Sequence, residues 1–175
     1  MPEIKFAAAI VLAVVLLASC GNELPGSSEG KNSSVSAYKK KETYFHLPVI
    51  NGRNIDLEEH AGKPVLLLFF AEYCPHCQKA APFIKSMYSK YTGELVFIGI
   101  GVEGKSESAR FAAENNLNFP VAYNGGRIAR KYHARGVPYI YILDKDHNIM
   151  DFWAGYDSSF DQEIISSIKQ VITKS

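Results

Sequence analysis

The chain has 175 residues, a formal net charge of +1, 47% hydrophobic residues and 21% charged residues. This composition suits roughly one globular domain and excludes collagen-like, low-complexity and wholly disordered chains. The near-neutral charge gives no electrostatic reason to expect a nucleic-acid partner. The 3 cysteines are too few for a disulfide-rich miniprotein.

The first 19 residues are typical of a secretion signal. Residues 6–18 form an uninterrupted apolar run, shorter than the roughly 20 residues of a membrane-spanning helix and typical of a signal peptide. The sequence Leu17-Ala18-Ser19-Cys20-Gly21 resembles the lipobox of bacterial lipoproteins. That resemblance implies cleavage before Cys20 and membrane attachment through lipid on Cys20. A plain secretory signal and an uncleaved anchor remain alternatives.

Residues 20–43 are expected to form a flexible tether. They are rich in Ser, Gly, Asn and Lys and have almost no large apolar side chains. Such a segment cannot bury a hydrophobic core. The folded domain is therefore expected over residues 44–175.

Apolar segments and turn signals alternate along this domain and predict one sheet with helices on both faces. Two short apolar stretches flank Asn51-Gly52, which predicts a β-hairpin that turns at these two residues. Ser159 and Gln162 predict a capping box at the start of the last helix. The expected strands are 65–71, 95–102, 119–123, 139–143 and 149–153, and the other expected helices are 75–91, 106–116 and 126–133.

The chemistry lies in Cys74-Pro75-His76-Cys77, where the first central strand meets its helix. Cysteines three residues apart in a first helical turn are close enough for a disulfide. Free N–H groups and the positive end of the helix dipole favour a thiolate at Cys74, and His76 can add positive charge or a hydrogen bond. The pattern predicts Cys74 as the exposed nucleophile and Cys77 as the resolving thiol.

Five other functions of a Cys-x-x-Cys motif can be compared with the residues present. A structural disulfide across so small a loop constrains the unfolded chain little, and a zinc site needs four ligands where only three are local. Covalent haem attachment would need histidine where Gln78 stands, and a peroxidase lacks its Thr-x-x-Cys pattern. A copper delivery protein, with His133 as a distant ligand, remains the alternative. The dithiol reaction itself requires no cofactor.

Residues 69–77 resemble the active site of the thioredoxin superfamily, with Tyr73 where its members usually have tryptophan. Pro82 matches the proline that kinks the active-site helix, and Gly136-Val137-Pro138 resembles the cis-proline loop. The resemblance implies a thioredoxin-like α/β fold over about residues 44–173: a central mixed sheet flanked by helices, with an N-terminal β-hairpin extension. It implies that Pro138 lies against the dithiol and that the substrate contacts Tyr73, Pro75 and Val137.

The N-terminal hairpin, Gly62-Lys63-Pro64 and residues 142–146 narrow the resemblance to TlpA- or ResA-like oxidoreductases tethered in the bacterial cell envelope, facing the periplasm or the outer cell surface. The resemblance implies thiol–disulfide exchange with protein substrates, cytochrome c maturation as one family role, and a redox partner that resets the dithiol. The Pro-His dipeptide instead resembles oxidising DsbA-type centres.

Two departures from the family concern proton transfer. Leu68 stands where thioredoxins have a buried acid, and Ala80 stands where ResA-like members have glutamate. Either acid would help to move the proton of the buried thiol. Glu72 and Glu103 are therefore the candidate replacements.

Overall fold

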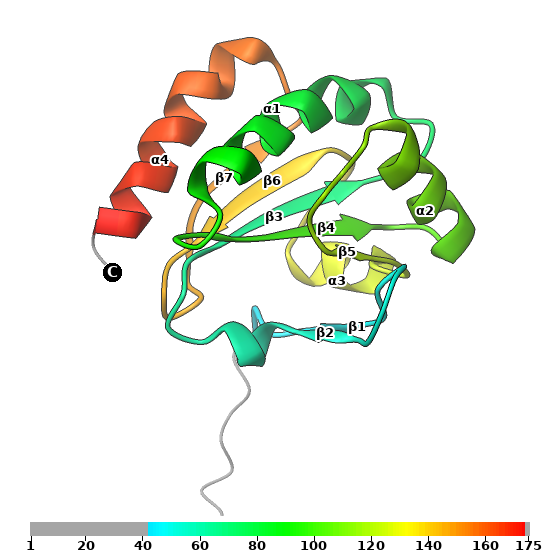
Figure 1. The fold of residues 1–175 in the computed structure, drawn as a ribbon, viewed down its shortest axis with the longest axis horizontal. Helices are drawn as coiled ribbons and strands as arrows, with labels where there is room; N and C mark the ends of the chain where they lie inside the picture. Colours follow the sequence, from blue (N-terminus) through cyan, green and yellow to red (C-terminus); the bar gives the residue numbers. More distant parts are fainter. Residues whose placement is uncertain (1–41, 174–175) are drawn as a thin grey trace, which may run out of the picture. The chain divides into compact units, whose positions relative to one another are not determined.

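A mixed five-stranded sheet forms the centre of the molecule (Figure 1). The computed structural model describes residues 42–173, so the expected signal segment and nearly all of the expected tether lie outside the described residues. The strand order is β5-β4-β3-β6-β7, with β4 and β5 running parallel to β3 and with β6 and β7 joined by antiparallel pairing. This confirms the predicted thioredoxin-like arrangement. The strands are β3 (Val65–Phe70), β4 (Val96–Gly101), β5 (Val121–Ala122), β6 (Tyr139–Leu143) and β7 (Ile149–Ala154).

β3 lies at the middle of the sheet because all six of its residues are apolar and buried. Successive side chains of a strand point to opposite faces. Leu66, Leu68 and Phe70 accordingly pack in one core cluster, whereas the three residues between and before them, among them Phe69, pack in a second. The sheet thus separates two hydrophobic cores.

In the part of the chain that the structure describes, three helices cover one face of the sheet, and one short helix covers part of the other face (Figure 1). α1 (Pro75–Tyr91) and α4 (Asp161–Thr173) contribute to the first cluster, as does α2 (Lys105–Glu114). The short helix α3 (Gly126–Lys131) and the N-terminal strands contribute to the second. Within the described residues, no helix has the length and apolar character that crossing a membrane requires.

The N-terminal hairpin is present and its connection contains Asn51-Gly52, but this connection is wider than the predicted two-residue turn. β1 (His46–Leu47) and β2 (Ile55–Asp56) pair antiparallel, and residues 48–54 connect them. The chain leaves β1 early because it pairs with the edge of the main sheet. The Ile50 N–H donates to the Val121 carbonyl over 2.9 Å, and the Tyr123 N–H donates to the Pro48 carbonyl over 3.1 Å. These bonds open the connection. The 3-10 helix η1 (Leu57–His60) follows β2.

The start of the last helix also differs from the prediction. The 3-10 helix η2 (Ser158–Phe160) precedes α4. Its cap is Asp157, whose carboxylate accepts the Ser159 N–H over 3.0 Å. Ser159 is therefore inside the 3-10 turn and is not an N-cap, so the capping box predicted from Ser159 and Gln162 is wrong.

Candidate active site

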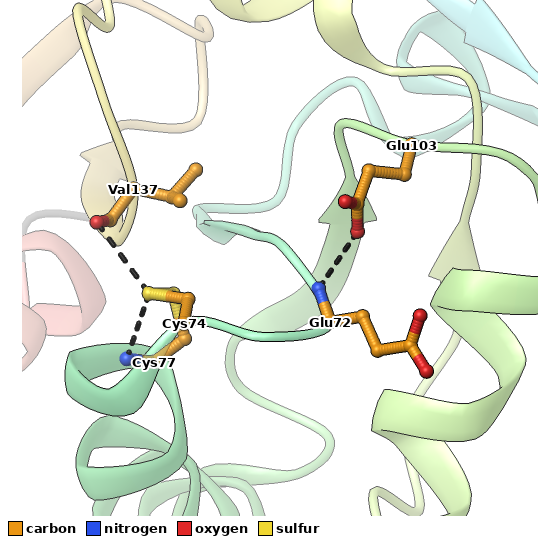
Figure 2. Close-up of a disulfide and its surroundings, with 5 residues drawn as sticks. All are labelled: Glu72, Cys74, Cys77, Glu103 and Val137. Atoms are coloured by element: carbon orange, nitrogen blue, oxygen red, sulfur yellow. Dashed lines mark hydrogen bonds between the residues drawn. A yellow bond between two sulfur atoms is a disulfide. The ribbon is translucent and has the colours of Figure 1, made fainter.

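The two cysteines form a disulfide at the N-terminus of α1 (Figure 2). β3 ends at Phe70, and α1 begins at Pro75, a residue suited to the first helical position because it has no N–H there to leave unpaired. Cys74 is the N-cap: its Sγ accepts the Cys77 N–H over 3.1 Å. The Cα atoms of the two cysteines are 5.2 Å apart, within the ordinary range for a disulfide.

The two sulfur-bearing residues differ in their access to solvent. Cys77 is completely buried, whereas Cys74 retains 8% of its surface. Around Cys74, Tyr73 is 82% exposed, and Pro75 and His76 are exposed as well. Cys74 is therefore the more exposed of the two residues, and the assignment of Cys74 as nucleophile and Cys77 as resolving thiol stays a prediction.

The connection between α3 and β6 brings the Val137–Pro138 stretch to the dithiol. The peptide bond between these residues is cis. The Val137 carbonyl oxygen lies 3.5 Å from Cys74 Sγ (Figure 2). A disulfide sulfur has no hydrogen to donate, so this is a close contact in the oxidised state, and a reduced Cys74 thiol can donate across it.

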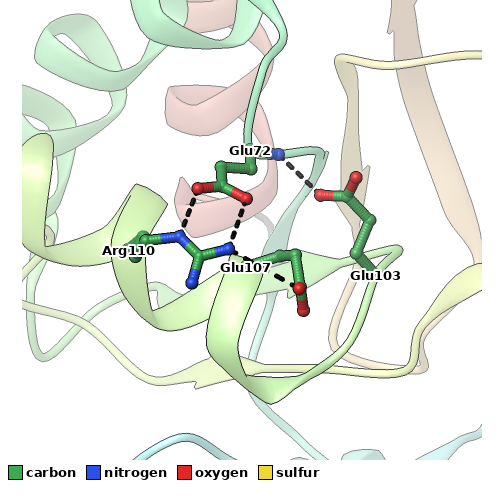
Figure 3. Close-up of polar contacts among 4 residues, drawn as sticks. All are labelled: Glu72, Glu103, Glu107 and Arg110. Carbon is green, nitrogen blue, oxygen red and sulfur yellow. Dashed lines mark hydrogen bonds and ion pairs between the residues drawn. The ribbon is translucent and has the colours of Figure 1, made fainter.

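The two candidate proton-transfer acids have other partners. The Glu72 carboxylate is buried and accepts two hydrogen bonds from Arg110 of α2, one of 2.9 Å from Nη2 (Figure 3). The hydrogen bond from Arg110 is the main reason that the pKa of Glu72 is lowered. Glu103 accepts the backbone N–H of Glu72 over 2.7 Å. In Figure 2 the Glu72 carboxylate points away from the disulfide.

Buried apolar side chains occupy the two positions where the family has acids. Leu68 and Ala80 are both completely buried. Neither Leu68 nor Ala80 can exchange a proton with Cys77. Proton transfer at the buried sulfur therefore uses neither of the acids that the resemblance implied.

Sequence reasoning missed Arg110. It lies 38 residues from Glu72 in the chain, and only its spacing from Glu107, a partner at 3.5 Å on the same helix, is visible in the sequence. His133, the distant ligand of the copper alternative, lines a cavity with Tyr139 and Phe152 instead. Among residues 42–173, no three His, Cys, Asp or Glu side chains lie close enough together to hold a metal ion.

Known proteins share this sequence pattern and this fold. The AhpC/TSA family model matches residues 29–152, which is more than half of the chain. The thioredoxin-like protein YneN of Bacillus subtilis is 28% identical over 63% of this chain and 68% of its own. The thiol-disulfide oxidoreductase ResA of Bacillus thuringiensis is 29% identical over 63% of this chain and 66% of its own. The matched segment thus spans about two thirds of these relatives.

A solved structure extends the likeness to the fold. The putative thiol:disulfide interchange protein DsbE from Chlorobium tepidum superposes with a TM-score of 0.70, covering 74% of this chain and 93% of that protein at 21% identity. At that identity the likeness concerns the fold alone. Together with the Cys74–Cys77 disulfide, the sequence relatives define the class. The chain belongs to the AhpC/TSA family of thioredoxin-like proteins and is a thiol–disulfide oxidoreductase.

Proposed function

We propose that this oxidoreductase is lipid-anchored in the bacterial cell envelope and exchanges disulfides with cysteine-containing proteins on the extracytoplasmic side. The observation that carries the exchange is the Cys74–Cys77 disulfide at the N-terminus of α1, beside the Val137 carbonyl. Apocytochrome c is the client class that the resemblance to ResA-like proteins implies. A redox partner resets the dithiol after each cycle.

The exchange has two steps in the reducing direction. The Cys74 thiolate attacks one sulfur of a substrate disulfide, forms a mixed disulfide and releases the other substrate sulfur as a thiolate. The Cys77 thiolate then attacks Cys74 Sγ, which restores the Cys74–Cys77 disulfide and releases the second substrate thiolate. In the oxidising direction a substrate thiolate attacks Cys74 and the same bonds exchange in reverse.

The fold contributes positioning and electrostatics to these steps. Cys74 Sγ accepts the Cys77 N–H at the helix start, so a negative charge on that sulfur meets a donor and the positive helix end. We assign His76 and Pro138 to the catalytic site with the two cysteines. Tyr73, Pro75 and Val137 are assigned to substrate contact, because they surround the accessible sulfur.

Insulin reduction by the full chain tests the exchange. With dithiothreitol as reductant, we expect the wild type to accelerate insulin precipitation and a Cys74→Ala variant to match the uncatalysed rate. A copper(I) titration of the reduced protein runs beside it. Stoichiometric, tight copper binding without insulin reduction would instead establish the metal-delivery alternative.

The anchor is tested separately, because Cys20 lies outside the described residues. We expect Cys20→Ala to move the protein from the membrane fraction to the soluble fraction, because several acyl chains hold a protein on a membrane. Insulin reduction by the released protein should equal that of the wild type. A variant that stays quantitatively in the membrane fraction would contradict lipid attachment at Cys20.

A further inference from the structure

An aromatic hollow opens on the face of the sheet opposite α1 and α4. Its volume is about 480 Å³, and Tyr139, Tyr141 and Phe152 line it. The Tyr139 and Phe152 rings both stack on Tyr141, with ring centroids 5.9 and 5.8 Å apart. Phe152 is 59% exposed, and Ile149 beside it is 41% exposed. Large apolar side chains exposed together mark interaction sites on soluble proteins.

The hollow exists because α3 covers only part of this face. Tyr132, the residue after α3, contacts Phe69 of β3 and Tyr141 of β6, with ring centroids 5.6 and 5.3 Å apart. Beyond Tyr141 the lining toward β7 consists of Phe152 and Ile149, with His133 and Arg135 from the loop after α3. Phe152 of β7 is thus left exposed and Tyr139 of β6 partly exposed, whereas Tyr141 beneath them is buried.

The segment that supplies Arg135 to the lining of the hollow is basic. Residues 126–136 contain four Arg or Lys residues and no Asp or Glu, although the whole chain has a net charge of only +1. All four are exposed. Lys131 donates to the Tyr44 carbonyl. Within residues 42–173, Arg127, Arg130 and Arg135 form no salt bridge. Such a surface attracts an acidic partner.

One short segment, residues 135–139, supplies side chains to the hollow and the carbonyl that contacts the dithiol. Arg135 lies two residues before Val137, whose carbonyl contacts Cys74 Sγ, and Tyr139 directly follows Pro138. A chain that presents its sulfur to Cys74 therefore passes the residues that border the hollow. The surface is concave, so it suits an inserted side chain better than the flat surface of a bilayer.

We propose that this hollow docks an acidic segment, containing an aromatic side chain, of the protein that exchanges disulfides with Cys74. The inference rests on the proposed function and names the chemistry of its partner. The aromatic side chain packs on the exposed side of Phe152, whose ring already stacks on Tyr139 with centroids 6.5 Å apart, and the acidic residues meet Arg135 and the basic residues of α3. Docking holds the partner's sulfur close to Cys74 and increases the rate of exchange.

Three synthetic peptides of equal length test the proposal. Each carries one cysteine linked by a disulfide to thionitrobenzoate: one is rich in Asp with a Phe, one replaces Asp with Lys, and one replaces Phe with Gly. The reduced full chain attacks the peptide sulfur through Cys74 and releases coloured thionitrobenzoate. We expect the Asp–Phe peptide to react about tenfold faster than either other peptide, and salt to diminish its advantage over the Lys peptide.

Variants locate the effect on the molecule. Arg135→Glu should remove the preference for Asp over Lys, and Phe152→Ser should remove the preference for Phe over Gly. Lys169→Glu makes the same charge change on an exposed residue of α4, and it should keep both preferences. Neutral hydroxyethyl disulfide should oxidise all four proteins at one rate, because it is too small to reach the hollow from Cys74.

The other possible outcomes contradict either the docking proposal alone or the exchange function as well. Equal rates for the three peptides, with hydroxyethyl disulfide still reacting, would overturn the docking proposal and leave the exchange function intact. No reaction with any disulfide would overturn the exchange function and the docking proposal with it. If Arg135→Glu and Phe152→Ser left peptide rates unchanged but abolished binding to vesicles containing phosphatidylglycerol, the face would be a membrane contact and the proposal wrong.

Discussion

The carboxylate of Glu72, two residues before Cys74, is held by the guanidinium of Arg110 on α2 (Figure 3). The Glu72 backbone N–H is held in turn by Glu103, which follows β4. The short segment between β3 and α1 is thereby tied to two other parts of the chain. Its position, and so that of Cys74, depends on an ion pair as well as on the flanking strand and helix.

Replacing Arg110 with Met should destabilise the fold most at neutral pH. The pKa of Glu72 lies below its usual value of about 4.3 because Arg110 stabilises the ionised form. Such a group contributes stability above its unfolded-state pKa and loses it as the pH falls through the folded-state pKa. The difference in unfolding free energy between wild type and Arg110→Met, measured by urea denaturation, should therefore shrink below about pH 4.

Two further variants separate the pair from general helix damage. Glu107→Gln removes the weaker partner of Arg110 and should change stability little. A Glu72→Leu/Arg110→Met double variant removes both charges and should be more stable than Arg110→Met, because it leaves no buried charge without a partner. If the double variant were no more stable than Arg110→Met, the loss of stability in Arg110→Met would not come from an unpaired Glu72 carboxylate.

The two single-cysteine variants should trap unequal amounts of mixed disulfide with a substrate protein. Cys74 retains 8% of its surface, whereas Cys77 retains none. Cys77→Ala should accumulate mixed disulfides with oxidised insulin, roughly tenfold more than Cys74→Ala, because the resolving attack is missing. Non-reducing electrophoresis and mass spectrometry measure the products. Equal trapping by the two variants would reverse or abolish the assigned roles.

His76 and Asp157 should shift the reduction potential in opposite directions. Asp157 is close enough to His76 and Lys79 for their charges to help lower its pKa, after the larger effect of hydrogen bonding to Ser159. A positive His76 favours a Cys74 thiolate, which stabilises the reduced state and makes the disulfide more oxidising. We expect His76→Gly to raise the Cys74 pKa and make the site more reducing by roughly 15–30 mV, about 30 mV for each pKa unit.

Asp157→Asn provides the matched control. Asparagine can still accept the Ser159 N–H, but the negative charge near the start of α1 is gone. The potential should move toward the oxidising side. Glutathione equilibration and thiolate absorbance titrations measure both variants. Unchanged values for His76→Gly would reduce that residue to a spacer between the cysteines.

Gly125 should be intolerant of a side chain. A Cβ at this residue would lie 2.2 Å from Ile100 Cγ2 and 3.0 Å from the Gly101 carbonyl oxygen. Because strand backbone cannot easily withdraw, Gly125→Ala should cost about 1–3 kcal/mol in unfolding free energy. Gly136→Ala is the control, since a Cβ there meets nothing within 4 Å and Gly136 has no positive φ. Chemical denaturation of both variants gives the comparison.

Local patterns predicted the elements that local chemistry determines. Pro75 and the apolar spacing gave the bounds of α1 as the structure has them, and the apolar run at 65–71 gave β3 with an error of one residue. The dithiol was predictable for the same reason, because its two cysteines lie within a single helical turn.

The predictions from the sequence were wrong or incomplete where contacts between residues far apart in the chain determine the local structure. Asn51-Gly52 has the composition of a tight turn, but pairing of residues 48–50 with β5 opens the connection. Serine is a common N-cap residue, but here the Asp157 carboxylate accepts the Ser159 N–H, so Asp157 is the cap. Glu72 looked like a free acid near the dithiol, and nothing in the local sequence showed that Arg110 binds it.

The pairing of residues 48–50 with β5 also affects how copies of the protein meet. A sheet edge with unpaired backbone groups is a template for another chain. The bridge between Val49 and Ala122 occupies the β5 edge, so among the described residues the opposite strand, β7, has a sheet neighbour on one side only. β7 carries the charged Asp151, and its register with β6 shifts at Ile142/Leu143. Both features oppose the pairing of β7 with a strand of another copy, so the sheet is closed to growth at both of its edges.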